Sequence, residues 1–213
     1  MPELNEIQEQ IRDRFDRKSA GRELALQGAR RTIRSCANAI RAIHRHEWDT
    51  ALERIAEAEA SLREAEDALR PFPEIFFAGF LQDAQIEYVE ARCTYAILRE
   101  EPFPSHTDLQ IMEAPYLNGL GDTVGELRRH ILDLMRHGEL ERCEQLLQAM
   151  DDLYVVMTSM DYPDAITGGL RRRADVARSL LERTRGEFSI ALIQQRLEAR
   201  LAAHADRLRE SGA

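Results

Sequence analysis

Apolar residues recur along this chain with the three- and four-residue spacing of helices that are buried on one side. Residues 4–46 show this spacing at Leu26, Ile33, Ala37 and Ile40. Residues 48–69 repeat it at Trp48, Leu52, Ile55, Leu62, Ala65 and Leu69. No stretch alternates apolar and polar positions as a half-buried strand would, so the pattern predicts an all-α protein.

Prolines and glycines divide this pattern into helices. Pro71-Phe72-Pro73 ends the second helix, Gly138 fits the C-cap of the fourth, and Gly186 separates the last two. The sequence then predicts seven helices, at about 4–46, 48–69 and 74–100, a fourth that begins near 108–115 and runs to about 137, and three more at 139–160, 164–184 and 188–210. Short connections between them favour a single bundle domain that spans residues 1–213.

The predicted helix at 74–100 is apolar around most of its circumference, which is typical of a central helix or of an interface. Phe76, Phe77 and Phe80 are candidates for contacts with a second copy of the chain. We therefore expect a homo-oligomer.

The composition excludes several classes of protein. Stretches without charge reach only about ten residues, whereas a helix needs roughly 20 to cross a bilayer. The first residues, Met1–Glu6, are acidic and lack the apolar core of a signal peptide. The three cysteines, Cys36, Cys93 and Cys143, are scattered among apolar neighbours and predict core positions rather than a disulfide framework. We expect a cytoplasmic protein without a membrane partner.

The net charge of −9 argues, taken alone, against nucleic acid, but the charges are segregated along the chain. Residues 22–46 hold six arginines and one acid, and residues 47–70 hold eight acids and three arginines. Residues 170–185 hold six arginines and two acids. An acidic total therefore leaves room for a basic binding surface.

Four arginines of the first predicted helix, Arg30, Arg34, Arg41 and Arg45, fall on one stripe about 60° wide at 100° per residue. A row of guanidinium groups suits the phosphates of a nucleic-acid backbone. Pairing with the acidic helix at 48–69 is an equally plausible use of the same charges.

Two further helices carry paired carboxylates. Glu87 and Glu90 share a face with Asp83, and Asp122 and Glu126 lie one turn apart. Glycines 119, 121 and 125 leave room beside the second pair for another backbone or a ligand. Carboxylates on two helices could bind a hard cation such as Mg²⁺, which could then activate water. The alternative is that these acids form solvated faces or salt bridges.

The histidines are weaker candidates. His44 and His46 point to different sides of one helix and are expected to be surface residues rather than ligands. His130, four residues after Glu126, could approach a metal, although a surface pair is the simpler expectation.

Several blocks of the sequence resemble the translin family. Residues Tyr116–Leu127 resemble its Y-L-x-G-x-x-D-x-x-G-E-L motif, and Glu87–Ala91 resembles the E-Y-V-E-A of its catalytic branch, translin-associated factor X. Asp161–Arg172 and Arg183–Glu187 also resemble blocks of archaeal and bacterial members. The resemblance extends over essentially the whole chain.

This resemblance implies an all-α RNA-binding protein that assembles into a hollow shell, with an octamer favoured. In the factor X branch, inward-facing acids bind Mg²⁺ and cleave single-stranded RNA. By motif, these acids correspond to Glu87, Glu90, Asp122 and Glu126, while Arg34 and Arg41 resemble basic residues of the family's first helix. Mn²⁺ is an alternative metal, and single-stranded DNA is an alternative ligand.

Three hypotheses follow. The first is a Mg²⁺-dependent endoribonuclease whose catalytic and metal-binding acids are those four residues. The second is a shell that binds RNA or DNA without cleaving it. The third is a helical interaction protein whose charges only keep it in solution.

Overall fold

The computed structural model describes residues 2–211, and in them every regular element of secondary structure is a helix, as the periodicity predicts. The helices are α1 (Pro2–His44), α2 (Trp48–Leu69), α3 (Pro73–Phe76), α4 (Phe80–Arg99), α5 (Glu113–His137), α6 (Leu140–Thr158), α7 (Asp164–Thr167) and α8 (Leu170–Ser211).

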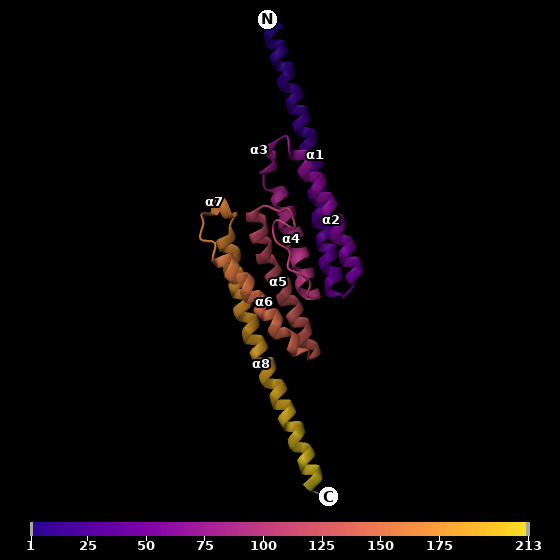
Figure 1. The fold of residues 1–213 in the computed structure, drawn as a ribbon, viewed down its shortest axis with the longest axis vertical. Coiled ribbons are helices and arrows are strands. Elements are labelled where there is room, and N and C mark those ends of the chain that lie inside the picture. The colour runs from indigo at the N-terminus through magenta and orange to yellow at the C-terminus, as the bar shows by residue number, and fades with distance from the viewer. Residues whose placement is uncertain (1, 212–213) are drawn as a thin grey trace.

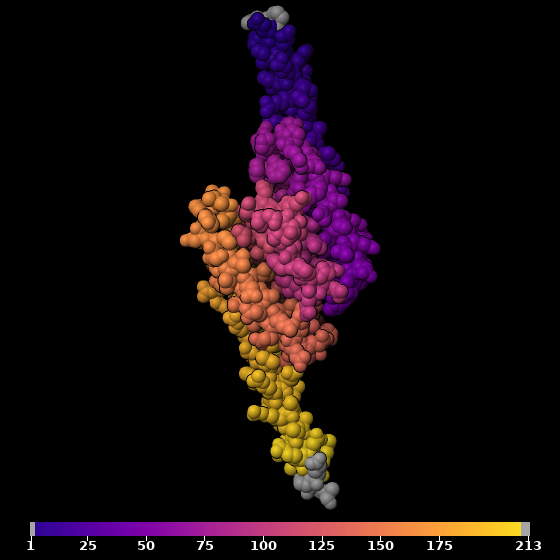
Figure 2. All heavy atoms as spheres, viewed as in Figure 1, coloured from indigo at the N-terminus to yellow at the C-terminus, as the bar shows by residue number. Residues whose placement is uncertain are grey.

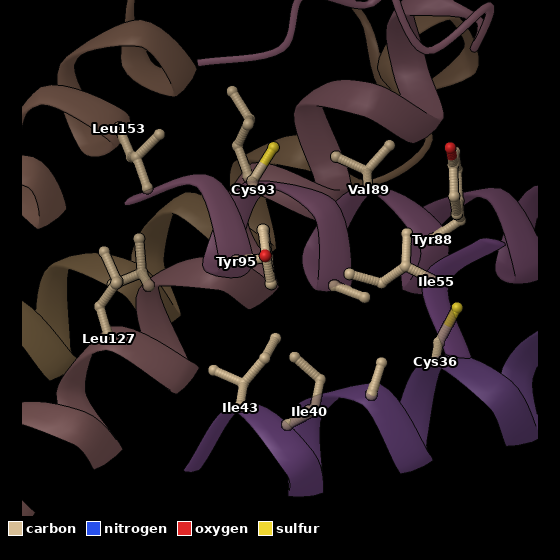
Figure 3. Close-up of a cluster of buried hydrophobic side chains, with 14 of the residues drawn as sticks. Cys36, Ile40, Ile43, Ile55, Tyr88, Val89, Cys93, Tyr95, Leu127 and Leu153 are labelled. Carbon is tan, nitrogen blue, oxygen red and sulfur yellow. The ribbon is translucent and has the colours of Figure 1, made fainter. Parts of the chain in front are cut away.

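Helices α4 and α5 form the centre of the bundle (Figure 1). The hairpin of α1 and α2 packs on α4, and α6 and α8 pack on α5. Figure 3 shows Cys36, Ile40 and Ile43 along one side of α1, facing apolar residues of α4 such as Val89. All three cysteines are buried and free, as predicted.

Three helix boundaries differ from the sequence-based prediction. The helix predicted at 164–184 is interrupted after Thr167 by Gly168 and Gly169, which have positive φ values. The stretch predicted as one helix at 74–100 is divided into α3 and α4 by Gly79, whose φ of +100° interrupts the helix. The predicted break at Gly186 is absent, because one glycine costs a helix only about 1 kcal/mol. Arg128 of α5 offsets this cost by donating hydrogen bonds to Glu187, at 2.8 and 3.1 Å, and to Thr184, at 2.7 Å.

The start of α1 and the end of α8 extend beyond the bundle at opposite ends (Figures 1 and 2). Both extensions carry exposed apolar residues at helical spacing. On α1 these are Leu4, Ile7, Ile11 and Phe15, and on α8 they are Ile190, Ile193, Leu197 and Leu201. Of the predicted interface phenylalanines, Phe77 is 65% exposed, whereas Phe76 and Phe80 pack partly against the core. None of the described helices is long and apolar enough to span a bilayer.

Candidate active site

Glycine allows α4 and α5 to approach closely at the centre of the bundle. A Cβ atom added to Gly119 would lie 2.6 Å from Cβ of Val89 and 2.9 Å from the carbonyl oxygen of Ile86. A Cβ on Gly121 would lie 2.8 Å from the Met157 methyl carbon and 3.2 Å from Cβ of Arg173. Both positions agree with the sequence-based expectation of close approach. Gly125 differs, because no atom lies within 4 Å of its added Cβ.

This packing brings the four predicted acids together. Glu87 and Glu90 of α4, and Asp122 and Glu126 of α5, are all half-buried, and we call them the acid cluster. Asp83, the fifth acid on this side of α4, is exposed. The carboxylates act on one another through space. Burial, followed by the charges of Glu87, Asp122 and Glu126, raises the pKa of Glu90 to about 8.

The same causes act on two other members of the cluster. Burial and then the charge of Asp122 raise the pKa of Glu87. Burial also raises the pKa of Asp122, although the nearby Arg173 guanidinium works in the opposite direction. The acid cluster therefore holds more negative charge than its surroundings neutralise.

Two side chains that were not predicted as site residues make hydrogen bonds to the cluster. Arg173, in the first turn of α8, donates to Asp122, and His44, at the end of α1, hydrogen-bonds Glu126 through Nε2. Because a carboxylate oxygen accepts, Nε2 is the donor. Glu126 also lies 3.7 Å from Arg129. The basic run around Arg173 was visible in the sequence, but its partner on α5 was not.

The predictions for His44 and His130 were wrong. The His44 side chain is only 5% exposed, and its Nδ1 has no hydrogen-bond partner among the described residues. His130 is 7% exposed, and its ring centroid lies 6.2 Å from that of His44 and 5.6 Å from that of His46. Burial, and then the neighbouring His44 and His46, lower the pKa of His130 to about 4. The lowered pKa of His130 disfavours the charged form that an ion pair requires. His130 therefore forms part of the wall of the site rather than a surface ion pair.

The donor chemistry of the acid cluster suits a hard cation, since four carboxylates supply the oxygen ligands that Mg²⁺ prefers. The mutual repulsion that raises the pKa of Glu90 is what a bound cation would relieve. In the part of the chain that the structure describes, however, no three His, Cys, Asp or Glu side chains are arranged to hold a metal ion. Arg173 and His44 each engage one carboxylate of the α5 pair.

The predicted arginine stripe is exposed on α1. Arg30, Arg34, Arg41 and Arg45 all face solvent, and none of them makes an ion pair with α2 within residues 2–211. Arg45 pairs with Glu47 at 2.8 Å, and it is Arg31 that reaches Glu64 of α2. The stripe therefore remains open to a ligand at three of its four positions. It also lies on the helix whose last turn provides His44, so α1 links the stripe to the acid cluster.

Other motif residues hold the helices around the site in place. Asn118 of α5 donates through Nδ2 to the carbonyl oxygen of Thr167, at 2.8 Å, where α7 ends. The next residues, Gly168 and Gly169, have positive φ values of 62° and 86° and turn the chain into α8. The three arginines Arg171, Arg178 and Arg185 of α8 pair with acids. Arg173 differs from them in that its partner, Asp122, belongs to the acid cluster.

The fold and the site define an all-α bundle with an acid cluster between its two central helices. No family model matches the chain. The uncharacterized protein MJ0175 of Methanocaldococcus jannaschii is 35% identical over 173 residues, which are 80% of this chain and 76% of that protein.

Solved structures share the fold across almost their whole length. AfC3PO is 33% identical with a TM-score of 0.81, over 87% of this chain and 97% of AfC3PO. A complex of AfC3PO with duplex RNA matches at 32% identity and a TM-score of 0.81, over 87% of this chain and 96% of that one. NeC3PO, at 19% identity and a TM-score of 0.78 over 90% and 98% of the chains, shares the fold. This chain belongs to the translin family, with the C3PO proteins.

Proposed function

We propose that this protein is a Mg²⁺-dependent endoribonuclease that cleaves single-stranded RNA inside an oligomeric shell. The observation that carries the proposal is the acid cluster, in which burial and like charge raise the pKa of Glu90 to about 8. Carboxylates with such perturbed pKa values concentrate at functional sites.

Glu87, Glu90, Asp122 and Glu126 would hold the metal ion, with Mn²⁺ as a substitute. When bound, the ion would supply Lewis-acid activation of water and of a phosphoryl oxygen. His44 holds the Glu126 carboxylate through its Nε2 hydrogen bond, and the buried apolar contacts of Gly119 fix the distance between the two helices. The chain thus provides two rigid helices that carry the four carboxylates.

Arg30, Arg34, Arg41 and Arg45 would bind the phosphates of the strand. Their exposure supports this role, as does the complex that AfC3PO forms with duplex RNA. Phosphate contacts of this kind weaken steeply as salt is raised. Single-stranded DNA could occupy the same stripe, since guanidinium groups recognise the phosphates that both nucleic acids share.

Assembly into a homo-oligomer, with an octamer favoured, would give the exposed apolar stripes of α1 and α8 a partner. Eight large apolar residues on these extensions are exposed in the single chain, a feature typical of surfaces covered by another molecule. Light scattering at micromolar concentration tests this part of the proposal, and a monomer of 24.4 kDa would contradict it.

The nuclease itself is tested by incubating labelled single-stranded RNA and a duplex of the same sequence with the protein, in Mg²⁺ and in EDTA. We expect cleavage of the single strand only in Mg²⁺, with 5′-phosphate and 3′-hydroxyl products. A Glu90→Gln variant purified in parallel exposes a contaminating nuclease, which would cleave equally in both samples. A 2′,3′-cyclic phosphate product would overturn the metal-activated water mechanism.

A second candidate function is a shell that binds RNA or DNA without cleaving it. The specific observation in its favour is that Asp122 and Glu126 are already paired with Arg173 and His44, as structural acids would be. Binding of RNA that persists in EDTA, with no cleavage in Mg²⁺ or Mn²⁺, would favour this function.

A further inference from the structure

Arg173 is placed to do more than neutralise one acid. Its guanidinium donates to Asp122 from α8, while the side chains of both residues remain about a third exposed, at 33% and 34%. An ion pair at this depth is worth little in net stability, since solvent screens it. The two partners can therefore separate at low cost.

The stem of Arg173 begins against α5. The Arg173 Cβ atom would lie 3.2 Å from a Cβ added to Gly121, so this side chain starts close to the backbone of α5, beside Asp122. In the described part of the chain, the guanidinium makes one side-chain hydrogen bond, to Asp122.

The space around the guanidinium is open on two sides. A cavity of about 680 Å³ lies between α4 and the start of α5 and is lined by Asp83, Ile86 and Arg173, among others. A second cavity of about 400 Å³ is lined by Gly121, Asp122, Gly169 and Arg173. Arg173 lines both cavities, and Asp122 is the member of the acid cluster that lines the second, so the guanidinium has open space to move into beside Asp122.

The charge of Arg173 acts on three of the four carboxylates of the cluster. It lowers the pKa values of Glu87 and Glu90 as well as that of Asp122, opposing the repulsion among the carboxylates. Once another cation occupied the cluster, the positive charge of Arg173 would no longer be needed to offset the carboxylates. Two cations beside one carboxylate would also repel each other. A phosphate brought to the cluster would then be the strongest acceptor within reach of a guanidinium.

We propose that Asp122 exchanges Arg173 for the metal ion and that the released guanidinium binds the RNA phosphate at the acid cluster. Arg173 would thus be both the resident counter-cation of the empty site and a substrate ligand of the loaded one. This inference rests on the proposed nuclease function.

The test separates metal binding from cleavage. Binding of Mn²⁺ to the full-length protein, without RNA, is followed by the electron paramagnetic resonance signal of the free ion. Single-stranded RNA cleavage is measured at saturating metal on the same samples. The variants are Arg173→Gln and Arg173→Lys, with Arg178→Gln as the matched control. Arg178 is an exposed α8 residue paired with Glu182 at 2.8 Å, so its replacement removes the same charge elsewhere on the helix.

We expect Arg173→Gln to bind Mn²⁺ about tenfold more tightly, because the competing cation is gone, and to cleave RNA about 100-fold more slowly, because a phosphate ligand is gone. Arg173→Lys keeps the charge and should lie between the wild type and Arg173→Gln in both measurements. Arg178→Gln should match the wild type. A merely structural arginine would not produce opposite changes in metal affinity and rate.

The outcomes that overturn the inference are distinct from those that overturn the nuclease. Unchanged or weaker Mn²⁺ binding by Arg173→Gln, in an active wild-type background, would exclude the exchange at Asp122. Tighter binding with unchanged cleavage would exclude the phosphate contact. If the wild type neither binds Mn²⁺ nor cleaves RNA, the nuclease proposal fails and this inference fails with it. Should Arg173→Gln not fold, as judged by circular dichroism, Arg173→Lys alone decides between these outcomes.

Discussion

The protein has two acidic regions that differ in how their charge is balanced. On α2, acids stand three residues from arginines, and the pairs Arg54–Glu57, Arg63–Glu66 and Arg70–Asp67 close at 2.7 to 2.8 Å near the surface. In the acid cluster, four half-buried carboxylates lie on α4 and α5, their charges act on one another through space, and Arg173 and His44 reach two of them from distant helices.

This difference shows that the number of acids does not identify a site. Segment 47–70 holds eight acids, more than the cluster, yet most of its carboxylates are exposed to water, and three of them pair with arginines three residues away. The cluster is distinguished by burial without sufficient neutralisation, which is why the pKa of Glu90 rises to about 8. Making the same substitution in both regions, or at matched positions, tests this distinction.

The largest expected effect is on cleavage. Replacing Glu90 by Gln should lower the rate of single-stranded RNA cleavage in Mg²⁺ by about 1,000-fold, since one ligand of the proposed metal is lost from a desolvated site. The same replacement at Glu57 of α2 should leave the rate within about twofold, since screened surface charges contribute little. Comparable losses in the two variants would show that net charge, rather than the cluster, controls the rate.

The second prediction concerns stability in the absence of metal. The folded-state pKa of Glu90 is about 8, above its ordinary value of 4.5, so folding favours the protonated form. Stability from this group is fully present below about pH 4.5 and is lost as the pH rises through about 8. Glu90→Gln lacks this loss, so its free energy of unfolding should exceed that of the wild type by about 2–4 kcal/mol at pH 8.5 in EDTA.

Urea unfolding of both proteins at pH 5 and pH 8.5 measures this difference. The advantage of Glu90→Gln should shrink toward the lower pH, and Glu57→Gln provides the control from α2. Parallel pH dependences for wild type and Glu90→Gln would contradict the raised pKa.

The third prediction compares two glycines of α5. Gly119→Ala places a methyl group against Val89 and should destabilise the protein by about 2 kcal/mol while separating the carboxylates of α4 from those of α5. Gly125→Ala meets no atom within 4 Å and should stabilise the helix by up to about 1 kcal/mol. Thermal unfolding compares the two variants, and a destabilised Gly125→Ala would show that the open space there is used in the assembled protein.

The smallest effect is expected at His44. His44→Leu removes the donor to Glu126 and should lower cleavage about tenfold, the equivalent of one hydrogen bond to a charged group. His44→Gln retains an amide donor near the position of Nε2 and should recover most of the activity. Equal losses in the two variants would assign His44 a packing role instead.

Local pattern was sufficient to predict much of the fold. The all-α class, the C-cap at Gly138 and the four acids of the cluster all follow from spacing along single helices and from motif resemblance. The break at Gly79 was missed because nothing in the composition of residues 74–100 distinguishes a glycine that adopts positive φ from one that stays helical. The break expected at Gly186 failed for the opposite reason, since the stabilising contact comes from Arg128, far away in sequence.

The same limit applies to the site. The sequence places Asp122 and Glu126 on one helix face, but their partners Arg173 and His44 lie 51 and 82 residues away. His44 was expected at the surface because His44 and His46 point to different sides of one helix, while its contact with Glu126 depends on α5. Pairings across helices depend on how the bundle closes, and helical spacing carries no information about that.

The burial of Cys36 has a consequence for how the protein can be observed. Its thiol is 1% exposed beneath the acid cluster, and burial together with the charges of Glu87 and Glu90 raises its pKa far above the ordinary range. A thiol reagent therefore reacts only when α1 separates from α4. The rate of Cys36 alkylation therefore measures how often α1 separates from α4 behind the carboxylates. This measurement needs no assay of catalysis.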